Sequence, residues 1–253
     1  MTRFAEWCAQ TDIPVAHHKL HILTADPAKL AAAVYIVAEV VPDHYIMPGR
    51  LAQLLTRLGR GKVAAYVAEK LPTTKQIKSG DLGEILCTTF IHETTPFKLG
   101  IKRLRWKDHR NMSMRGDDVL AFHIGAGAVG LQVLKAEAKS GGKMQAGTVS
   151  TARDALSAYG ELPSPHAMSF VADRLEAAVD KPLRDMLDDA QLKRNLKPAH
   201  VTHMLFTFSG NDTTAMLSKN LASYVGGSAQ HYVGIRVEDH QAFIKSVFAA
   251  AEV

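Results

Sequence analysis

The sequence predicts an α/β protein in which an α-rich N-terminal region precedes a unit of mixed helices and strands. Three observations support this fold class. The 253 residues are 47% hydrophobic and 22% charged, a globular composition. From residue 80 onward, helix-like and strand-like runs follow one another in the order α-β-β-β-α-β. The glycine-rich link from Gly125 to Gly130 is short enough for its two flanking strands to form an antiparallel pair.

The first 78 residues are expected to form a mainly helical region. Asp26 is suited to cap a helix whose first position is Pro27. Pro72 ends the last helix of this region, and the polar segment 73–79 is expected to be a linker. The elements expected here are a short strand at residues 18–24 and helices at residues 27–41, 49–58 and 62–71.

A second unit is expected over residues 79–253. Its first helix places Leu82, Ile85 and Phe90 on one face, and Pro96 ends it. The strands expected in this unit cover residues 99–106, 117–124, 131–139, 201–208 and 232–237. The expected helices cover residues 81–94, 150–159, 166–178, 182–193 and 239–251.

The composition excludes several classes of protein. Two cysteines, Cys8 and Cys87, are too few for a disulfide framework or a four-cysteine zinc site. The N-terminal segment lacks the apolar core of a secretory signal. The longest apolar stretch, residues 30–41, contains Glu39 and is too short to span a bilayer. These features predict a soluble cytoplasmic protein with no membrane partner.

Positive charge is concentrated in one segment. Seven basic residues and one acid, Asp108, lie between Lys98 and Arg115, although the net charge of the whole chain is only +5. Such a segment is either a solvated face or a surface that contacts the phosphates of a nucleic acid. The candidate phosphate contacts are Lys102, Arg103, Arg105, Lys107, Arg110 and Arg115.

A pair of carboxylates marks the strongest candidate site. Residues two apart in a strand share a face, so Glu137 and Lys139 are expected on the same side of the strand at residues 131–139. If this strand pairs with its predecessor, Asp118 at the start of that strand can face Glu137. Neighbouring carboxylates repel each other unless a cation lies between them, and Mg²⁺ prefers such ligands. The alternative is a simple ion pair on an exposed strand.

Glu84 is a candidate for a further carboxylate at this site. It lies in the helix expected at residues 81–94. The alternative is a surface glutamate in the first turn, where its charge is favourable against the helix dipole.

These residues resemble the active-site series of the PD-(D/E)xK, or restriction-endonuclease-like, nucleases. The similarity consists of Glu84 on a helix, Asp118 shortly after Gly116, and Glu137-x-Lys139 at the end of a hydrophobic strand. It implies a restriction-endonuclease-like α-β-β-β-α-β core. The proline of the family name is absent, which leaves the choice between Asp117 and Asp118 slightly open. Asp118 is preferred because the strand residues from Val119 onward follow it directly.

More narrowly, the stretches GDLGEILCTTFIHE, RGDDVLAFH and LQVLKAEAKS resemble the HamA effector family of bacterial Hachiman anti-phage systems, over about residues 79–210. The resemblance implies a metal-dependent DNA nuclease of little sequence specificity. It also implies a superfamily 2 helicase partner, HamB, that restrains the nuclease until foreign or damaged DNA is sensed. Asp118, Glu137 and the Ala138 carbonyl would then bind Mg²⁺ or Mn²⁺, with Glu84 as an additional metal contact, direct or water-mediated. Lys139 would position or activate the attacking water.

Two other functions remain open from the sequence. A non-catalytic nucleic-acid-binding adaptor would retain the basic segment with vestigial carboxylates. A dinucleotide-dependent oxidoreductase would use the run GAGAVG at residues 125–130, which matches the G-x-G-x-x-G fingerprint. That fingerprint requires a following helix and then a strand ending in an acid, and residues 141–149 contain no such strand. The region before residue 79 offers no chemistry and is interpreted as a scaffold or a docking surface for a partner.

Overall fold

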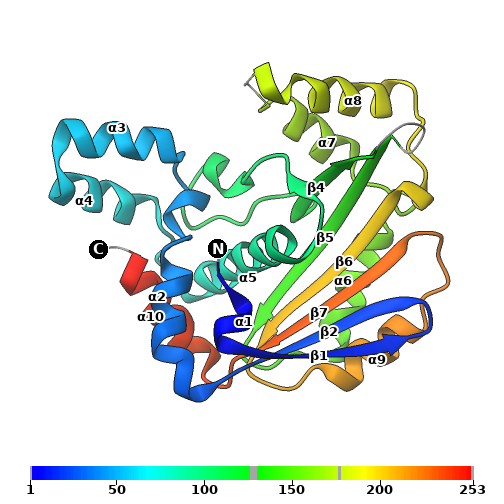
Figure 1. Ribbon diagram of the computed structural model, residues 1–253, viewed down its shortest axis with the longest axis horizontal. Helices are drawn as coiled ribbons and strands as arrows, with labels where there is room; N and C mark the ends of the chain where they lie inside the picture. Colours follow the sequence, from blue (N-terminus) through cyan, green and yellow to red (C-terminus); the bar gives the residue numbers. More distant parts are fainter. Residues whose placement is uncertain (1, 126–129, 176–177, 252–253) are drawn as a thin grey trace.

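The computed structural model describes residues 2–125, 130–175 and 178–251, and its centre is a mixed seven-stranded sheet (Figure 1). The strand order is β1-β2-β7-β6-β5-β4-β3. Strands β2, β7, β6 and β5 run parallel to one another, whereas β1, β4 and β3 each run antiparallel to a neighbour. The strands are β1 (Cys8–Val15), β2 (His18–Ala25), β3 (Lys98–Leu99), β4 (Val119–Ile124), β5 (Leu131–Gly141), β6 (Val201–Ser209) and β7 (Ala229–Arg236).

One face of the sheet is covered by three helices, α2 (Leu30–Ala38), α5 (Lys75–Thr94) and α10 (His240–Ala251) (Figure 1). Leu82, Ile85 and Phe90 of α5 are buried in the same cluster as Leu134 and Ala136 of β5. The central helix α5 therefore packs directly on β5, just before the candidate residues Glu137 and Lys139.

Helices from the second half of the chain cover the opposite face. Here α6 (Ala146–Ser157) and α9 (Thr214–Ala222) pack on β6 and β7, and α7 (Pro165–Ala172) and α8 (Lys181–Leu192) pack on β4 and β5. The remaining described elements are α1 (Phe4–Trp7), α3 (Pro48–Leu58), α4 (Arg60–Lys70), η1 (Pro27–Lys29), η2 (Pro42–His44), η3 (Arg103–Trp106), η5 (Ala178–Asp180) and η6 (Pro198–His200). A sheet between two helical layers confirms the α/β class.

Most elements agree with the sequence within a few residues. The side chain of Asp26 caps the first predicted helix by accepting a hydrogen bond from the amide of Ala28. Strands β4 and β5 form the expected antiparallel pair. Strand β1 and helix α9 were not expected. The residues of β1 are mostly exposed and include Pro14. Its sequence therefore lacks the alternation of buried and exposed residues by which a strand is recognised.

The strand expected at residues 99–106 is wrong. Only Lys98 and Leu99 pair with β4, and the chain then leaves the sheet and forms the short helix η3. The reason is electrostatic, because Arg103 and Arg105 of this segment reach carboxylates on other elements rather than neighbouring strands.

The linker expected at residues 73–79 is also wrong, because helix α5 begins at Lys75. Thr74 caps this helix by accepting a hydrogen bond from the amide of Ile77. The expected unit boundary at residue 78 therefore lies inside a helix. Strands on both sides of that boundary share one sheet, since β2 pairs with β7. Within the described part of the chain, no helix combines the length and apolar character needed to cross a membrane.

A buried polar network on β6 makes stability depend on pH. His203 is fully buried, its Nδ1 is 2.7 Å from Nη2 of Arg153, and its Nε2 is 2.9 Å from the carbonyl of Glu161. A neutral imidazole satisfies both contacts, because it accepts from Arg153 and donates to Glu161. Burial, aided by the charge of Arg153, lowers the pKa of His203 from 6.5 to about 4.

We therefore expect the contribution of His203 to the free energy of unfolding to fall as pH falls from about 6.5 to about 4. The unfolded chain takes up a proton at His203 in this interval before the folded chain does, which favours unfolding by roughly 1–2 kcal/mol near pH 5. His203→Gln should make the fall in Tm between neutral pH and pH 5 shallower. His92→Gln, at an exposed histidine, is the control and should leave the slope unchanged. Equal slopes for His203→Gln and the wild type would contradict this assignment.

Candidate metal and phosphate site

The register of β4 and β5 brings the two expected carboxylates together. Val119, the first residue of β4, pairs with Ala136, so Asp118 lies just beyond the last pair of the ladder, where its charge acts on Glu137. Asp118 is held there by a hydrogen bond of 3.0 Å from the amide of Ala138 to its Oδ2. An aspartate before one strand and a glutamate in the next thus become neighbours.

Glu137 and Lys139 form an ion pair on the same face of β5, with Nζ 2.5 Å from Oε1. Burial and then the charge of Asp118 raise the pKa of Glu137 from 4.5 to about 7. Burial by itself would lower the pKa of Lys139, but its hydrogen bond to Glu137 and the charge of Glu137 raise it. Lys139 is therefore a charged hydrogen-bond donor at neutral pH rather than a base.

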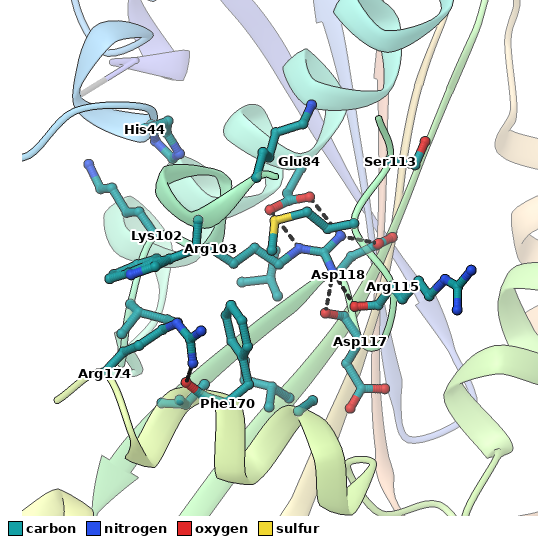
Figure 2. A pocket seen from close by; sticks show the side chains of 18 of the residues that line it. His44, Glu84, Lys102, Arg103, Ser113, Arg115, Asp117, Asp118, Phe170 and Arg174 are labelled. Atoms are coloured by element: carbon teal, nitrogen blue, oxygen red, sulfur yellow. Dashed lines mark hydrogen bonds and ion pairs between the residues drawn. The ribbon is translucent and has the colours of Figure 1, made fainter. Parts of the chain in front are cut away.

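Arg103 of η3 lies between the carboxylates of Glu84 and Asp118 (Figure 2). Its Nε and Nη2 donate to the two oxygens of Glu84 at 2.9 and 2.8 Å, and Nη2 also donates to Oδ1 of Asp118 at 2.7 Å. Its Nη1 donates to the carbonyl of Asp117 at 2.9 Å. Burial by itself would lower the pKa of Arg103, but Glu84 and Asp118 raise it. A guanidinium thus supplies the positive charge that these carboxylates require.

Glu84 is almost completely buried on α5, and this burial raises its pKa from 4.5 to about 7 although Arg103 acts in the opposite direction. Both of its oxygens accept from Arg103. Glu84 and Asp118 are therefore linked by the guanidinium of Arg103, which donates a hydrogen bond to each of them.

Asp117 and Asp118, the two aspartates between which the sequence does not decide, have different partners in the structure. Oδ2 of Asp117 accepts from the amide of Ser164 at 2.7 Å, and its Oδ1 lies 3.5 Å from Nζ of Lys135. Asp117 therefore holds the start of α7, which follows Ser164. Asp118 is the aspartate beside Glu137, so the geometry favours it as the metal ligand.

The donor chemistry of Asp118 and Glu137 suits a hard divalent cation. Carboxylate oxygens and water are the ligands that Mg²⁺ prefers, and a cation between the two groups would relieve the repulsion that raises the pKa of Glu137. In the described residues, no group of three or more His, Cys, Asp or Glu side chains is placed to hold a metal. A cation here would therefore rely on two carboxylates, a backbone carbonyl and water.

The other basic residues of the predicted phosphate surface are mostly engaged within the chain. Lys102 and Arg105 both pair with Asp43, and Lys107 pairs with Asp81 at 2.7 Å. Arg110 donates to the carbonyls of residues 68 and 69. Among the described residues, the side chain of Arg115 has no ion pair, and it is exposed. Phosphate binding by this segment stays a prediction.

The glycine run has a different context from the dinucleotide fingerprint. Residues 126–129 lie outside the described part of the chain, but Gly125 and Gly130 are joined by a backbone hydrogen bond of 2.9 Å. Strand β5 follows directly, antiparallel to β4, where the fingerprint requires a helix. The structural context required for the oxidoreductase alternative is therefore missing.

A cavity of about 440 Å³ adjoins Glu84 and Asp118 (Figure 2). Several candidates from the sequence line this cavity, but four other lining residues were not expected, namely Trp106, Phe170, Arg174 and His44. These residues carry no local motif, because they come from three separate segments that meet only in the folded chain. A tryptophan within a basic run was the only available signal. Glu137 and Lys139 lie outside the walls of this cavity.

Comparisons with known proteins show the family of this chain. A family model described as HamA matches residues 2–251. The chain is 25% identical over 256 residues to the Hachiman protein HamA of Bacillus cereus, covering 98% of this chain and 90% of the relative. Because the family match extends over nearly the whole sequence, the chain belongs to the HamA family.

Proposed function

We propose that this protein is a metal-dependent nuclease that hydrolyses DNA phosphodiester bonds with little sequence specificity. The single observation that carries the proposal is the contact of Asp118 with the Glu137-x-Lys139 strand. The elements α5, β3, β4, β5, α6 and β6 would form a restriction-endonuclease-like core that begins at Lys75 rather than at residue 79. The residues before it would add β1 and β2 to the sheet and supply a docking region.

In this mechanism Asp118, Glu137 and the carbonyl of Ala138 would hold Mg²⁺ or Mn²⁺. When bound, the cation would offset negative charge on the phosphate and lower the pKa of a bound water. Lys139 would donate a hydrogen bond that orients the attacking water, and its charge would stabilise the transition state. Its raised pKa favours this role over proton abstraction.

Glu84 would act through Arg103 rather than by direct metal contact. The carboxylate of Glu84 holds the guanidinium, and the guanidinium holds Oδ1 of Asp118. In this proposal Glu84 has a positioning role instead of the additional metal contact, direct or water-mediated, expected for it. The exposed Arg115 and the rest of the basic segment would attract the phosphate backbone, which makes binding sensitive to salt.

We also propose that the protein is an anti-phage effector with a helicase partner. The support is the match to a relative named as a Hachiman protein. Exposed apolar side chains on and near α2 and α3 offer a surface for such a partner, namely Tyr35, Met47, Leu55 and Leu58.

One observation favours a second candidate, a non-catalytic nucleic-acid-binding adaptor. Both oxygens of Asp118 already accept hydrogen bonds, one from Arg103 and one from the amide of Ala138. A site closed in this way in solution would bind DNA without cleaving it.

The test is cleavage of linear and supercoiled DNA by the purified chain with Mg²⁺, with Mn²⁺ or with EDTA. We expect cleavage with either metal, none with EDTA, and none from Glu137→Ala/Lys139→Ala. Binding without cleavage in every metal, with and without a co-purified partner, would favour the adaptor. Equal cleavage by the wild type and the double variant would mean that the reaction does not use this site.

A further inference from the structure

The cavity beside Asp118 has the size and the walls of a small-ligand site. Its volume of about 440 Å³ falls within the range of about 300–1,000 Å³ that is typical of such pockets. Trp106 of η3 and Phe170 of α7 form part of its lining, with ring centroids 6.3 Å apart in an edge-to-face contact. Figure 2 shows Phe170 projecting from its helix toward the segment that carries Arg103. The cavity therefore offers aromatic surface next to the candidate catalytic carboxylates.

Two polar atoms on the cavity lining lack partners. Nε2 of His44 and Nε of Arg174 are buried with no hydrogen-bond partner in the described part of the chain. His44 is only 2% exposed. Burial first, and then Lys102 and Arg105, lowers the pKa of His44 well below 6.5, so its ring is neutral. Buried polar groups are nearly always paired, so two unpaired polar atoms in residues of the cavity wall point to a partner that a ligand could supply after a small shift of these side chains.

Charged side chains of both signs line the cavity. Glu84 and Asp118 line it together with Arg115, whose exposed side chain is directed away from the cavity interior in Figure 2. Arg174 lies over the ring of Phe170, with its guanidinium carbon 3.6 Å from the ring centroid. Aromatic faces, hydrogen-bonding groups and nearby cations are the three features by which proteins bind unpaired nucleotides.

We propose that this cavity binds one nucleotide, with its base against Trp106 and Phe170 and its phosphate at the rim near Arg115. The inference rests on the proposed nuclease function, because it places the nucleotide beside the phosphodiester that would be cleaved at Asp118. A base can enter the cavity only after it leaves its stack, so unpaired strands or frayed ends are preferred over intact duplex. A nucleotide within a DNA strand and a free nucleotide share this chemistry, and binding measurements with both probes distinguish them.

The experiment is fluorescence anisotropy in EDTA, which measures binding without cleavage. The probes are a labelled oligothymidylate, the same strand paired with its complement, and free dTMP as a competitor. We expect the single strand to bind more tightly than the duplex. Trp106→Leu should weaken single-strand binding by roughly 5- to 100-fold, the usual effect of losing one stacking ring. Phe170→Leu is a second variant in case Trp106→Leu does not fold.

Tyr159→Leu is the matched control, because Tyr159 is an exposed aromatic residue after α6 and outside the cavity lining. It should leave affinity unchanged. Single-strand affinity that depends on Trp106 identifies a strand nucleotide as the occupant. Binding of dTMP that depends on Trp106, with no effect on the strand, identifies a free nucleotide. Unchanged binding of both probes in folded Trp106→Leu and Phe170→Leu would overturn the proposal.

Failure of this inference is distinguishable from failure of the proposed function. Cleavage is measured separately with Mg²⁺. A chain that binds single strands through Trp106 but cleaves nothing would retain the nucleotide site and lose the nuclease. If the protein cleaves DNA but its affinity does not depend on Trp106 or Phe170, the nuclease function is supported and the nucleotide site is contradicted.

Discussion

Replacing Lys139 by methionine is expected to slow DNA cleavage at saturating metal by on the order of 10²–10³-fold, the usual effect of removing one group that stabilises a transition state. Methionine keeps much of the length of the side chain but removes the ammonium that pairs with Glu137. Because Lys139 does not bind the metal in our proposal, the concentration of Mg²⁺ that gives half-maximal rate should change little. Single-turnover cleavage over a range of Mg²⁺ concentrations measures both quantities.

Glu137→Gln separates the metal ligand from the lysine. This change keeps the shape of the side chain but removes the charge, so we expect weaker Mn²⁺ binding as well as a lower rate. The metal affinity can be followed by electron paramagnetic resonance without any cleavage. The combined variant should be little slower than the worse single variant, because residues that act together have non-additive effects.

Matched controls are available close by on the chain. Lys143→Met removes an exposed lysine four residues beyond Lys139, and Glu39→Gln removes an exposed acid on another element. Both should cleave as the wild type does. A Lys139→Met variant that keeps full rate would refute the assigned mechanism, whereas a control variant with an equal loss would indicate a general effect of charge.

Replacing Arg103 by methionine is expected to lower the free energy of unfolding by about 3–5 kcal/mol in the absence of metal, the usual effect of removing one member of a buried ion pair. The change leaves Glu84 and Asp118 without the guanidinium that now bridges them. Chemical denaturation at fixed pH measures the loss. Arg103→Lys should lose much of the same stability, because an ammonium does not reproduce the fork that binds both carboxylates.

The pH dependence of this loss tests its cause. Without Arg103, the pKa of Glu84 should rise further above its value in the unfolded chain, because burial already raises it. The folded state then holds the additional proton, so the stability of Arg103→Met should fall as pH rises through neutrality. Added Mg²⁺ or Mn²⁺ should restore part of the stability by replacing the lost positive charge.

Arg110→Met is the control for Arg103→Met. Arg110 donates only to backbone carbonyls, and no carboxylate pairs with it among the described residues. Its loss should lower the free energy of unfolding by about 1 kcal/mol or less. An Arg103→Met variant as stable as Arg110→Met would show that the bridge between Glu84 and Asp118 contributes little.

The sequence predicted the candidate strands well, for a definite physical reason. Buried strands between glycine-rich turns leave a strong local pattern, and β4, β5, β6 and β7 lie where that pattern places them. The spacing of Glu137 and Lys139 also predicted their shared face, since side chains alternate along a strand.

Local pattern failed where contacts were distant along the chain. Residues 99–106 have a strand-like composition, but Arg103 pairs with Glu84 and Asp118, 19 and 15 residues away, and Arg105 pairs with Asp43, 62 residues away. For the same reason the sequence did not predict that the basic side chains of this segment pair with acids inside the chain. Its charge count suggested a free phosphate surface, but much of that charge is neutralised by acids on other elements.

By itself, the sequence determined the α/β class, the order of the main elements and the residue types of the candidate site. Only the tertiary structure decided which aspartate lies beside Glu137, which carboxylates Arg103 binds, and which rings line the neighbouring cavity. The physical reason is that periodicity and capping act over a few residues along the chain. Ion pairs and cavities instead depend on where distant segments meet, and that is set by packing of the whole sheet and its helices.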